Sequence, residues 1–105
     1  MTMKNIYQNI PKNAKEEIFE VLAKSENTRI ERIISNGPES SSGEWYDQEE
    51  NEWVVLLKGK AKLVFNEVEE VLEPGDHILI KPHRRHKVEI LEEAGETIWL
   101  AVHFK

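Results

Sequence analysis

The 105-residue sequence has no cysteine, which excludes a disulfide framework and any site built on thiolates. It also lacks a positive charge excess, because 14 Lys and Arg stand against 20 Asp and Glu, for a net charge of −6. Phosphate backbones attract the opposite balance, so we expect no nucleic-acid partner. No apolar run is long enough to cross a bilayer, and the N-terminal region has no apolar core of a signal peptide. The sequence therefore predicts a cytoplasmic protein without a membrane partner.

Helical periodicity is equally scarce, since only residues 13–27 carry it. Asn13 can cap a helix there, with Glu16 three residues later, and Ile18, Val21 and Leu22 follow as an apolar stripe. We predict a short helix at 13–27 that packs on the rest of the fold. Residues 1–27 then form an N-terminal segment, and residues 28–105 form the main domain.

Downstream of residue 27 the sequence reads as strands and turns. The candidate strands lie in TRIERIIS, EWVVLLKGKAKLVF, EVEEVLEPGDHILIKP, RRHKVEIL and ETIWLAVHF. Lys58-Gly59 divides the second stretch into what we predict to be a hairpin, and Pro74-Gly75 divides the third. About seven strands with close turns predict a small antiparallel sandwich or barrel.

Two polar clusters are candidate sites. One is the acidic stretch around Asp47 and Glu52, just before a strongly apolar strand, and it is either a solvated loop or half of a ligand site. The other is His83 and His86, which are either surface imidazoles or metal ligands, because two histidines alone do not define a metal site. His103 shares a strand face with Trp99 and Ala101, so it lines a pocket if that face points inward and lies at an exposed strand end if it does not.

The order of these motifs resembles the cupin superfamily, in particular its small single-domain bacterial members. Glu52 and Gly59 have the spacing that ends the first cupin motif. Gly75-Asp76 begins the second motif, and His86 lies at the place of its histidine. The resemblance covers about residues 28–104 and implies an all-β, antiparallel jelly-roll barrel, to which we add the short N-terminal helix.

The first motif departs from the family pattern, because its two histidines are absent. Depending on the gap before Glu52, their places are taken either by Tyr46 and Gln48 or by Trp45 and Asp47. The resemblance therefore supports the cupin fold more fully than it supports the family's usual metal site of three histidines and a glutamate.

The resemblance nevertheless implies a divalent metal, Zn, Fe, Mn or Ni, inside the barrel. The candidate ligands are His86, Glu52, Gln48, Asp47 and His83. Tyr46 and His83 are candidate proton-transfer groups, and Trp45 and His103 are candidate pocket residues. The implied function is to bind, or act on, a small organic metabolite, and an enzyme of this kind would be a metal-dependent dioxygenase, isomerase or lyase. The alternative is a metal-free binding or regulatory module.

The outward face of the strand that follows Glu52 predicts a partner. Trp53, Val55 and Leu57 alternate with the inward positions and form an apolar outer row. Such a row needs covering, either by the N-terminal helix or by a second copy, and by resemblance to other small cupins we expect a homodimer.

Overall fold

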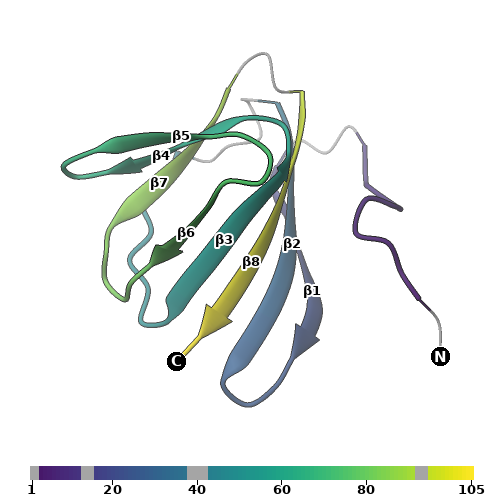
Figure 1. The fold of residues 1–105 in the computed structure, drawn as a ribbon, viewed down its shortest axis with the longest axis horizontal. Helices are drawn as coiled ribbons and strands as arrows, with labels where there is room; N and C mark the ends of the chain where they lie inside the picture. The colour runs from purple at the N-terminus through teal and green to yellow at the C-terminus, as the bar shows by residue number, and fades with distance from the viewer. Residues whose placement is uncertain (1–2, 13–15, 38–42, 92–94) are drawn as a thin grey trace.

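A computed structural model of the protein describes residues 3–12, 16–37, 43–91 and 95–105 (Figure 1). Eight β-strands and no helix are found in these residues. The strands are β1 (Ile18–Lys24), β2 (Thr28–Asn36), β3 (Asn51–Lys58), β4 (Ala61–Phe65), β5 (Glu69–Leu72), β6 (His77–Ile80), β7 (His86–Ile90) and β8 (Glu96–Phe104).

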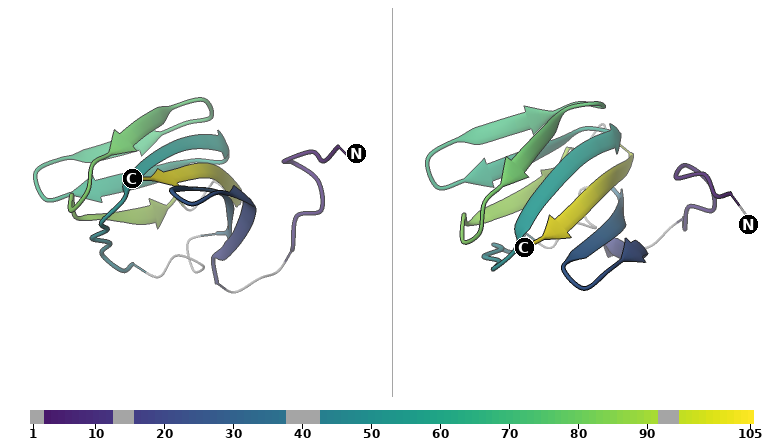
Figure 2. Two further views of the ribbon diagram at one scale, coloured as in Figure 1. Left: turned by 90° about the horizontal axis from the view of Figure 1, so that it is seen from below. Right: turned by 60° about the horizontal axis from the view of Figure 1, so that its bottom comes forward.

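The strands form two facing antiparallel sheets. The larger sheet has the order β1-β2-β8-β3-β6, and the smaller has the order β5-β4-β7. Figures 1 and 2 show the small sheet lying across one face of the large one. This arrangement confirms the predicted all-β, antiparallel jelly roll.

The core lies between the two sheets because alternate residues of each strand point inward. In β3, Val54 and Leu56 are buried while Trp53, Val55 and Leu57 are only half-buried. The small sheet contributes side chains such as Leu63, 1% exposed, from β4. Burying each such aliphatic side chain contributes about 1.5–3 kcal/mol, so this interface is the main source of stability.

The predicted helix at 13–27 is wrong. Residues 18–24 form β1, which pairs with β2 from Ile18↔Ile34 to Lys24↔Arg29, with a bulge between Val21 and Ala23. The backbone groups of β1 form hydrogen bonds with β2. The stability from this tertiary pairing outweighs the modest helical propensity of the segment. The expected capping residue, Asn13, lies outside the described residues.

The predicted hairpin at Lys58-Gly59 is also wrong, because β3 and β4 belong to different sheets. The chain crosses between the sheets at Gly59, whose φ is +91°. A Cβ atom there would lie 2.5 Å from Thr97 Oγ1 and 2.9 Å from the Glu96 carbonyl oxygen. Both the left-handed backbone and the close approach of β8 therefore require glycine.

A buried arginine fixes the N-terminal segment. Arg32, 5% exposed, donates hydrogen bonds to the backbone carbonyls of Ile6, Gln8 and Asn9. It also makes an ion pair of 2.7 Å with Glu20 on β1. One guanidinium thus ties residues 6–9 to the edge of the large sheet.

The described residues contain no helix long and apolar enough to span a membrane.

Candidate functional site

A cavity of about 310 Å³ lies between the two sheets. Its middle is apolar, with Ile33, Val54 and Trp99 from the large sheet and Leu63 and Val88 from the small one. Ionisable side chains are present among the same lining residues: Glu17, Arg29, Glu31, Glu50, Glu52, His86 and His103. The cavity is therefore an apolar slot that contains several charged groups, as ligand pockets commonly are.

Glu52 is the centre of the ionisable cluster and has an imidazole beside each carboxylate oxygen. Its Oε1 is 3.5 Å from His86 Nε2, and its Oε2 is 3.7 Å from His103 Nε2. The two histidines come from different sheets: His103 is the register partner of Glu52 on β8, and His86 begins β7 opposite. All three side chains are at most 10% exposed.

Glu31 on β2 extends this cluster. Its Oε1 is 3.0 Å from His103 Nε2, so His103 lies between two carboxylates. Glu31 Oε2 also forms an ion pair with Arg29 Nε at 3.3 Å, and Arg29 Nη1 lies 3.5 Å from Glu50 Oε1. The result is a chain of alternating carboxylates and basic groups along one end of the cavity.

The ionisation of Glu52 and His86 is coupled. Burial alone would raise the pKa of Glu52, but His86, the charge of His103 and the Gln48 amide outweigh burial and lower the pKa below the usual 4.5. Burial would lower the pKa of His86, but the Glu52 carboxylate and the Arg84 carbonyl raise it above 6.5. Each group therefore favours the charged form of the other.

The orientation of His86 is fixed by its backbone neighbours. Its Nδ1 lies 2.9 Å from the Arg84 carbonyl oxygen, which can only accept a hydrogen bond, so Nδ1 carries a proton and Nε2 faces Glu52. Tyr46 forms a two-bond bridge with the His86 backbone, of 2.7 and 3.1 Å. The Tyr46 ring lies 5.8 Å from the imidazole, between centroids.

Tyr46 and Gln48 line the cavity, whereas the residue between them does not. The Gln48 amide donates to Glu52 Oε1 at 3.2 Å. Extended backbone sends alternate side chains to opposite sides, so Asp47 points away. Of the two pairs that can replace the first-motif histidines, Tyr46 and Gln48 are the pair that faces the site.

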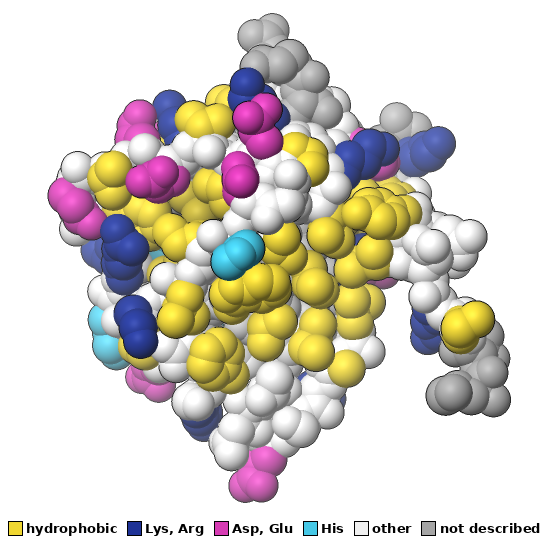
Figure 3. Space-filling model, viewed as in Figure 1, with side chains coloured by type: hydrophobic (Ala, Val, Ile, Leu, Met, Phe, Trp, Pro, Cys, Tyr) yellow, Lys and Arg dark blue, Asp and Glu magenta, His cyan; other side chains and the backbone are white. Residues whose placement is uncertain are grey.

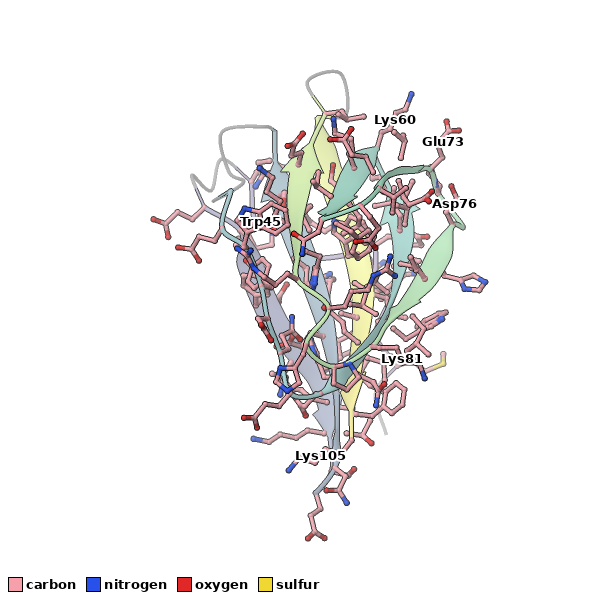
Figure 4. The ribbon with its side chains drawn as sticks, turned by 90° about the vertical axis from the view of Figure 1, so that its left-hand side faces the viewer. Trp45, Lys60, Glu73, Asp76, Lys81 and Lys105 are labelled. Atoms are coloured by element: carbon pink, nitrogen blue, oxygen red, sulfur yellow. The ribbon has the colours of Figure 1, made fainter. Side chains whose placement is uncertain are left out.

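Three other predicted site residues lie outside the cavity lining. His83, with φ +62°, has a side chain 65% exposed and pairs through Nδ1 with Asp47 Oδ1 at 2.7 Å. Trp45, labelled in Figure 4, is 38% exposed. The cations of Arg85 and Lys87 lie 4.8 and 5.2 Å from the centroid of its ring. The structure thus brings His86, Glu52, Gln48, Tyr46 and His103 together, and leaves Asp47, His83 and Trp45 on the rim or outside.

Glu31 was not singled out from the sequence, although it is a direct neighbour of His103 in the site. The alternation of TRIERIIS places Glu31 and Ile33 on one face, which was an available signal. In the described residues no group of three or more His, Asp or Glu side chains is arranged as a ready metal site. The cluster consists of groups that contact one another in pairs.

The fold and the interior cluster together define a cupin-type protein. The model of the cupin domain family matches residues 33–103, and the chain therefore belongs to that family. No protein of curated function gives a significant match.

Solved structures agree with this membership. A mannose-6-phosphate isomerase candidate from Ralstonia eutropha is 36% identical, with a TM-score of 0.89 and coverage of 100% of this chain and 99% of that one. A Klebsiella pneumoniae protein with a double-stranded β-helix domain is 13% identical, with a TM-score of 0.80 and coverages of 99% and 90%. HppE in its Fe(II) form is 16% identical, with a TM-score of 0.73 and coverages of 91% and 54%. The last two likenesses concern the fold alone.

Proposed function

We propose that this cupin binds a divalent metal ion at His86, His103 and Glu52, with Glu31 beside them, and holds a small organic molecule in the adjoining cavity. The observation that carries the proposal is the position of Glu52, which directs one carboxylate oxygen toward each of two buried imidazoles. Nitrogen and carboxylate donors of this kind suit Zn, Fe(II), Mn or Ni.

The residues fit such an ion in their chemistry. The Arg84 carbonyl keeps a proton on His86 Nδ1 and holds the ring in that orientation, so Nε2 is the nitrogen that would bind an ion, with loss of its own proton where the imidazole is charged. An ion would replace the present contacts of both imidazoles with Glu52 and Glu31, because the side chains now pair with one another. When bound, it would supply Lewis acidity toward an oxygen of the organic molecule.

The other cavity residues would position the organic molecule. Gln48 holds Glu52 through its amide, and Tyr46 presents its ring beside His86. In an isomerisation, the class suggested by the Ralstonia relative, the Tyr46 phenol would be the proton-transfer group within the cavity. The apolar wall of Trp99, Val54 and Leu63 would exclude water from the bound molecule.

Metal content of the purified protein tests the proposal. The native chain, purified without chelator and titrated with Fe(II), Mn, Zn and Ni, is expected to bind one of them near-stoichiometrically. His86→Ala and Glu52→Gln are expected to lose that ion. His83→Ala is the matched control, because it removes an exposed imidazole that does not line the cavity. A folded native protein that stays empty under titration would refute the metal site.

The second candidate is a metal-free binding module. It is favoured by the existing pairing, since Glu52 already has two imidazoles as partners and no group of three or more described His, Asp or Glu side chains forms a ready metal site. In that case small-molecule binding is insensitive to EDTA. Thermal shifts measured with and without EDTA separate the two functions.

We also propose that the protein is a homodimer through the outer face of its large sheet. Figure 3 shows a continuous apolar area on this face, where Trp53, Val55 and Leu57 of β3 lie beside Leu100 and Val102 of β8. These five positions carry no charged side chain, and Arg32 of β2 and His77 of β6 border them as the register partners of Leu100 and Val55. A second copy of the same face is therefore a suitable cover for the apolar area.

Light scattering after size exclusion tests the dimer. Val55→Asp is expected to give a monomer, because it places a charge in the apolar face. Val71→Asp is the control, since Val71 is 53% exposed on the other sheet. A native monomer at micromolar concentration would contradict the proposal.

A further inference from the structure

The carboxylates that line the cavity differ in whether a basic side chain lies beside them. Glu31 and Glu52 face imidazoles, and Glu31 and Glu50 share Arg29. Glu17, which also lines the cavity, has no Lys, Arg or His partner among the described residues. Among the same residues, Ser35 Oγ donates a hydrogen bond to Glu17 Oε2 at 3.3 Å. Within the described part of the chain, one carboxylate in the cavity wall therefore has no counter-charge.

Glu17 lies at the opposite end of the cavity from the histidines. Its partner Ser35 is four residues beyond Glu31 on the same face of β2, about 13 Å at the usual rise of about 3.3 Å per residue. Ile33 lies between those two positions, and Phe19 of β1 lines the cavity beside Glu17. The cavity thus has two polar ends joined by an apolar middle.

Glu17 is partly buried, so the lack of a positively charged partner for its carboxylate costs free energy. Burial raises the pKa of Glu17, and the hydrogen bond from Ser35 offsets this only in part. A carboxylate taken from water is stabilised by an opposite charge within hydrogen-bond distance. The cavity supplies none at this end from its described residues, whereas a ligand could.

An anionic ligand is disfavoured by the same charge inventory. Arg29 is the one Lys or Arg among the described lining residues, and two carboxylates already occupy it. At the Glu17 end of the cavity, a phosphate group would meet a carboxylate without a described guanidinium, ammonium or imidazole to receive it. This end of the cavity therefore differs from what a phosphate group requires.

We infer that the cavity binds a small organic cation with an alkyl or cycloalkyl body, its ammonium group held by Glu17 and its body lying against Phe19 and Ile33. This inference rests on the proposed binding of a small molecule in the cavity and specifies its class. The ammonium would supply the charge that Glu17 lacks, and the apolar middle would take the hydrocarbon part.

Three probes of one shape and different charge test the inference: cyclohexylamine, cyclohexanol and cyclohexanecarboxylate. Dissociation constants are measured at neutral pH by titration with NMR detection, after the metal content of the protein has been determined and any metal removed, because a bound ion would itself coordinate the carboxylate. The amine is expected to bind about tenfold more tightly than the alcohol, a ratio typical of one charge-assisted hydrogen bond, and the carboxylate more weakly still.

Glu17→Gln is expected to remove the preference for the amine and to leave metal content unchanged. Glu16→Gln is the matched control, because it makes the same change in net charge at an exposed neighbour that does not line the cavity. Equal or tighter binding of the carboxylate, an amine preference that survives in Glu17→Gln, or no amine binding would each overturn the inference. Metal content measured on the same samples reports separately on the proposed metal site.

Discussion

Replacing Glu52 by Gln should lower the free energy of unfolding at mildly acidic pH and leave it unchanged or slightly raised at high pH. The substitution keeps the size of the side chain and an oxygen that can accept from Gln48, but it removes the charge that faces His86 and His103. What is lost is then the electrostatic contribution of the cluster, with little change in packing.

The sign of the pH dependence follows from the two pKa shifts. Because the folded pKa of His86 lies above 6.5, its contribution is complete below pH 6.5 and is lost as pH rises through the raised value. Because the folded pKa of Glu52 lies below 4.5, its contribution is present above pH 4.5 and is lost as pH falls through the lowered value. The pair therefore stabilises the fold most between pH 4.5 and 6.5.

The burial of His86 and Glu52 and the distance between them set the expected loss of unfolding free energy. The His86 and Glu52 side chains are 4% and 10% exposed, so solvent screens their interaction little, but 3.5 Å is long for a charge-assisted hydrogen bond. We therefore expect Glu52→Gln to cost about 2 kcal/mol at about pH 5.5, within the range for hydrogen bonds to charged groups. At a pH above the raised pKa of His86 the imidazole is neutral, and removing a buried carboxylate should then be neutral or slightly stabilising.

Urea unfolding at the two pH values, followed by circular dichroism, measures this difference. At about pH 5.5 the midpoint should fall, whereas at about pH 9 it should stay or rise, with unchanged slope in both cases. Equal destabilisation at the two pH values would mean that Glu52 acts through packing rather than charge. A larger loss at about pH 9 would refute the coupling of Glu52 with His86.

Three further substitutions probe the fold. Gly59→Ala should cost at least about 2 kcal/mol of unfolding free energy, measured in urea, because it combines a left-handed φ with a clash against Thr97. Arg32→Met should free the N-terminal segment, seen as faster hydrogen exchange or trypsin cleavage at Lys12; unchanged protection would contradict the clamp. Asp47→Asn should shift stability by less than about 0.5 kcal/mol in thermal melts, since its pair with His83 is exposed.

The strands could be predicted well because their signals are local. ETIWLAVHF corresponds to β8, and TRIERIIS lies within β2. Residues 18–24 were misread because their apolar residues fit a helical stripe as well as a strand, and only the pairing with β2 distinguishes the two. The hairpin predicted at Lys58-Gly59 is wrong for a similar reason, since a glycine turn can also lead the chain from one sheet to the other.

Part of the candidate site could be predicted from the sequence. The resemblance to the cupin motifs pointed to Glu52 and His86, and the two possible lengths of the gap before Glu52 made Tyr46 and Gln48 one of two possible pairs. Sequence could not reveal that Glu31 contacts His103, because that contact depends on the pairing of β2 with β8. It also could not exclude His83, whose left-handed backbone and exposed ring are products of the loop conformation.

The place of β8 has a consequence for how the molecule is made. This strand follows the other seven along the chain, yet it lies between β2 and β3 in the middle of the large sheet. Until residues 96–104 have left the ribosome, β2 and β3 each have an open edge, and His103 is missing from the cluster. Nascent chains should therefore remain open and prone to strand-to-strand association until β8 has been made, and folding should be slow because contacts that complete the large sheet join distant residues.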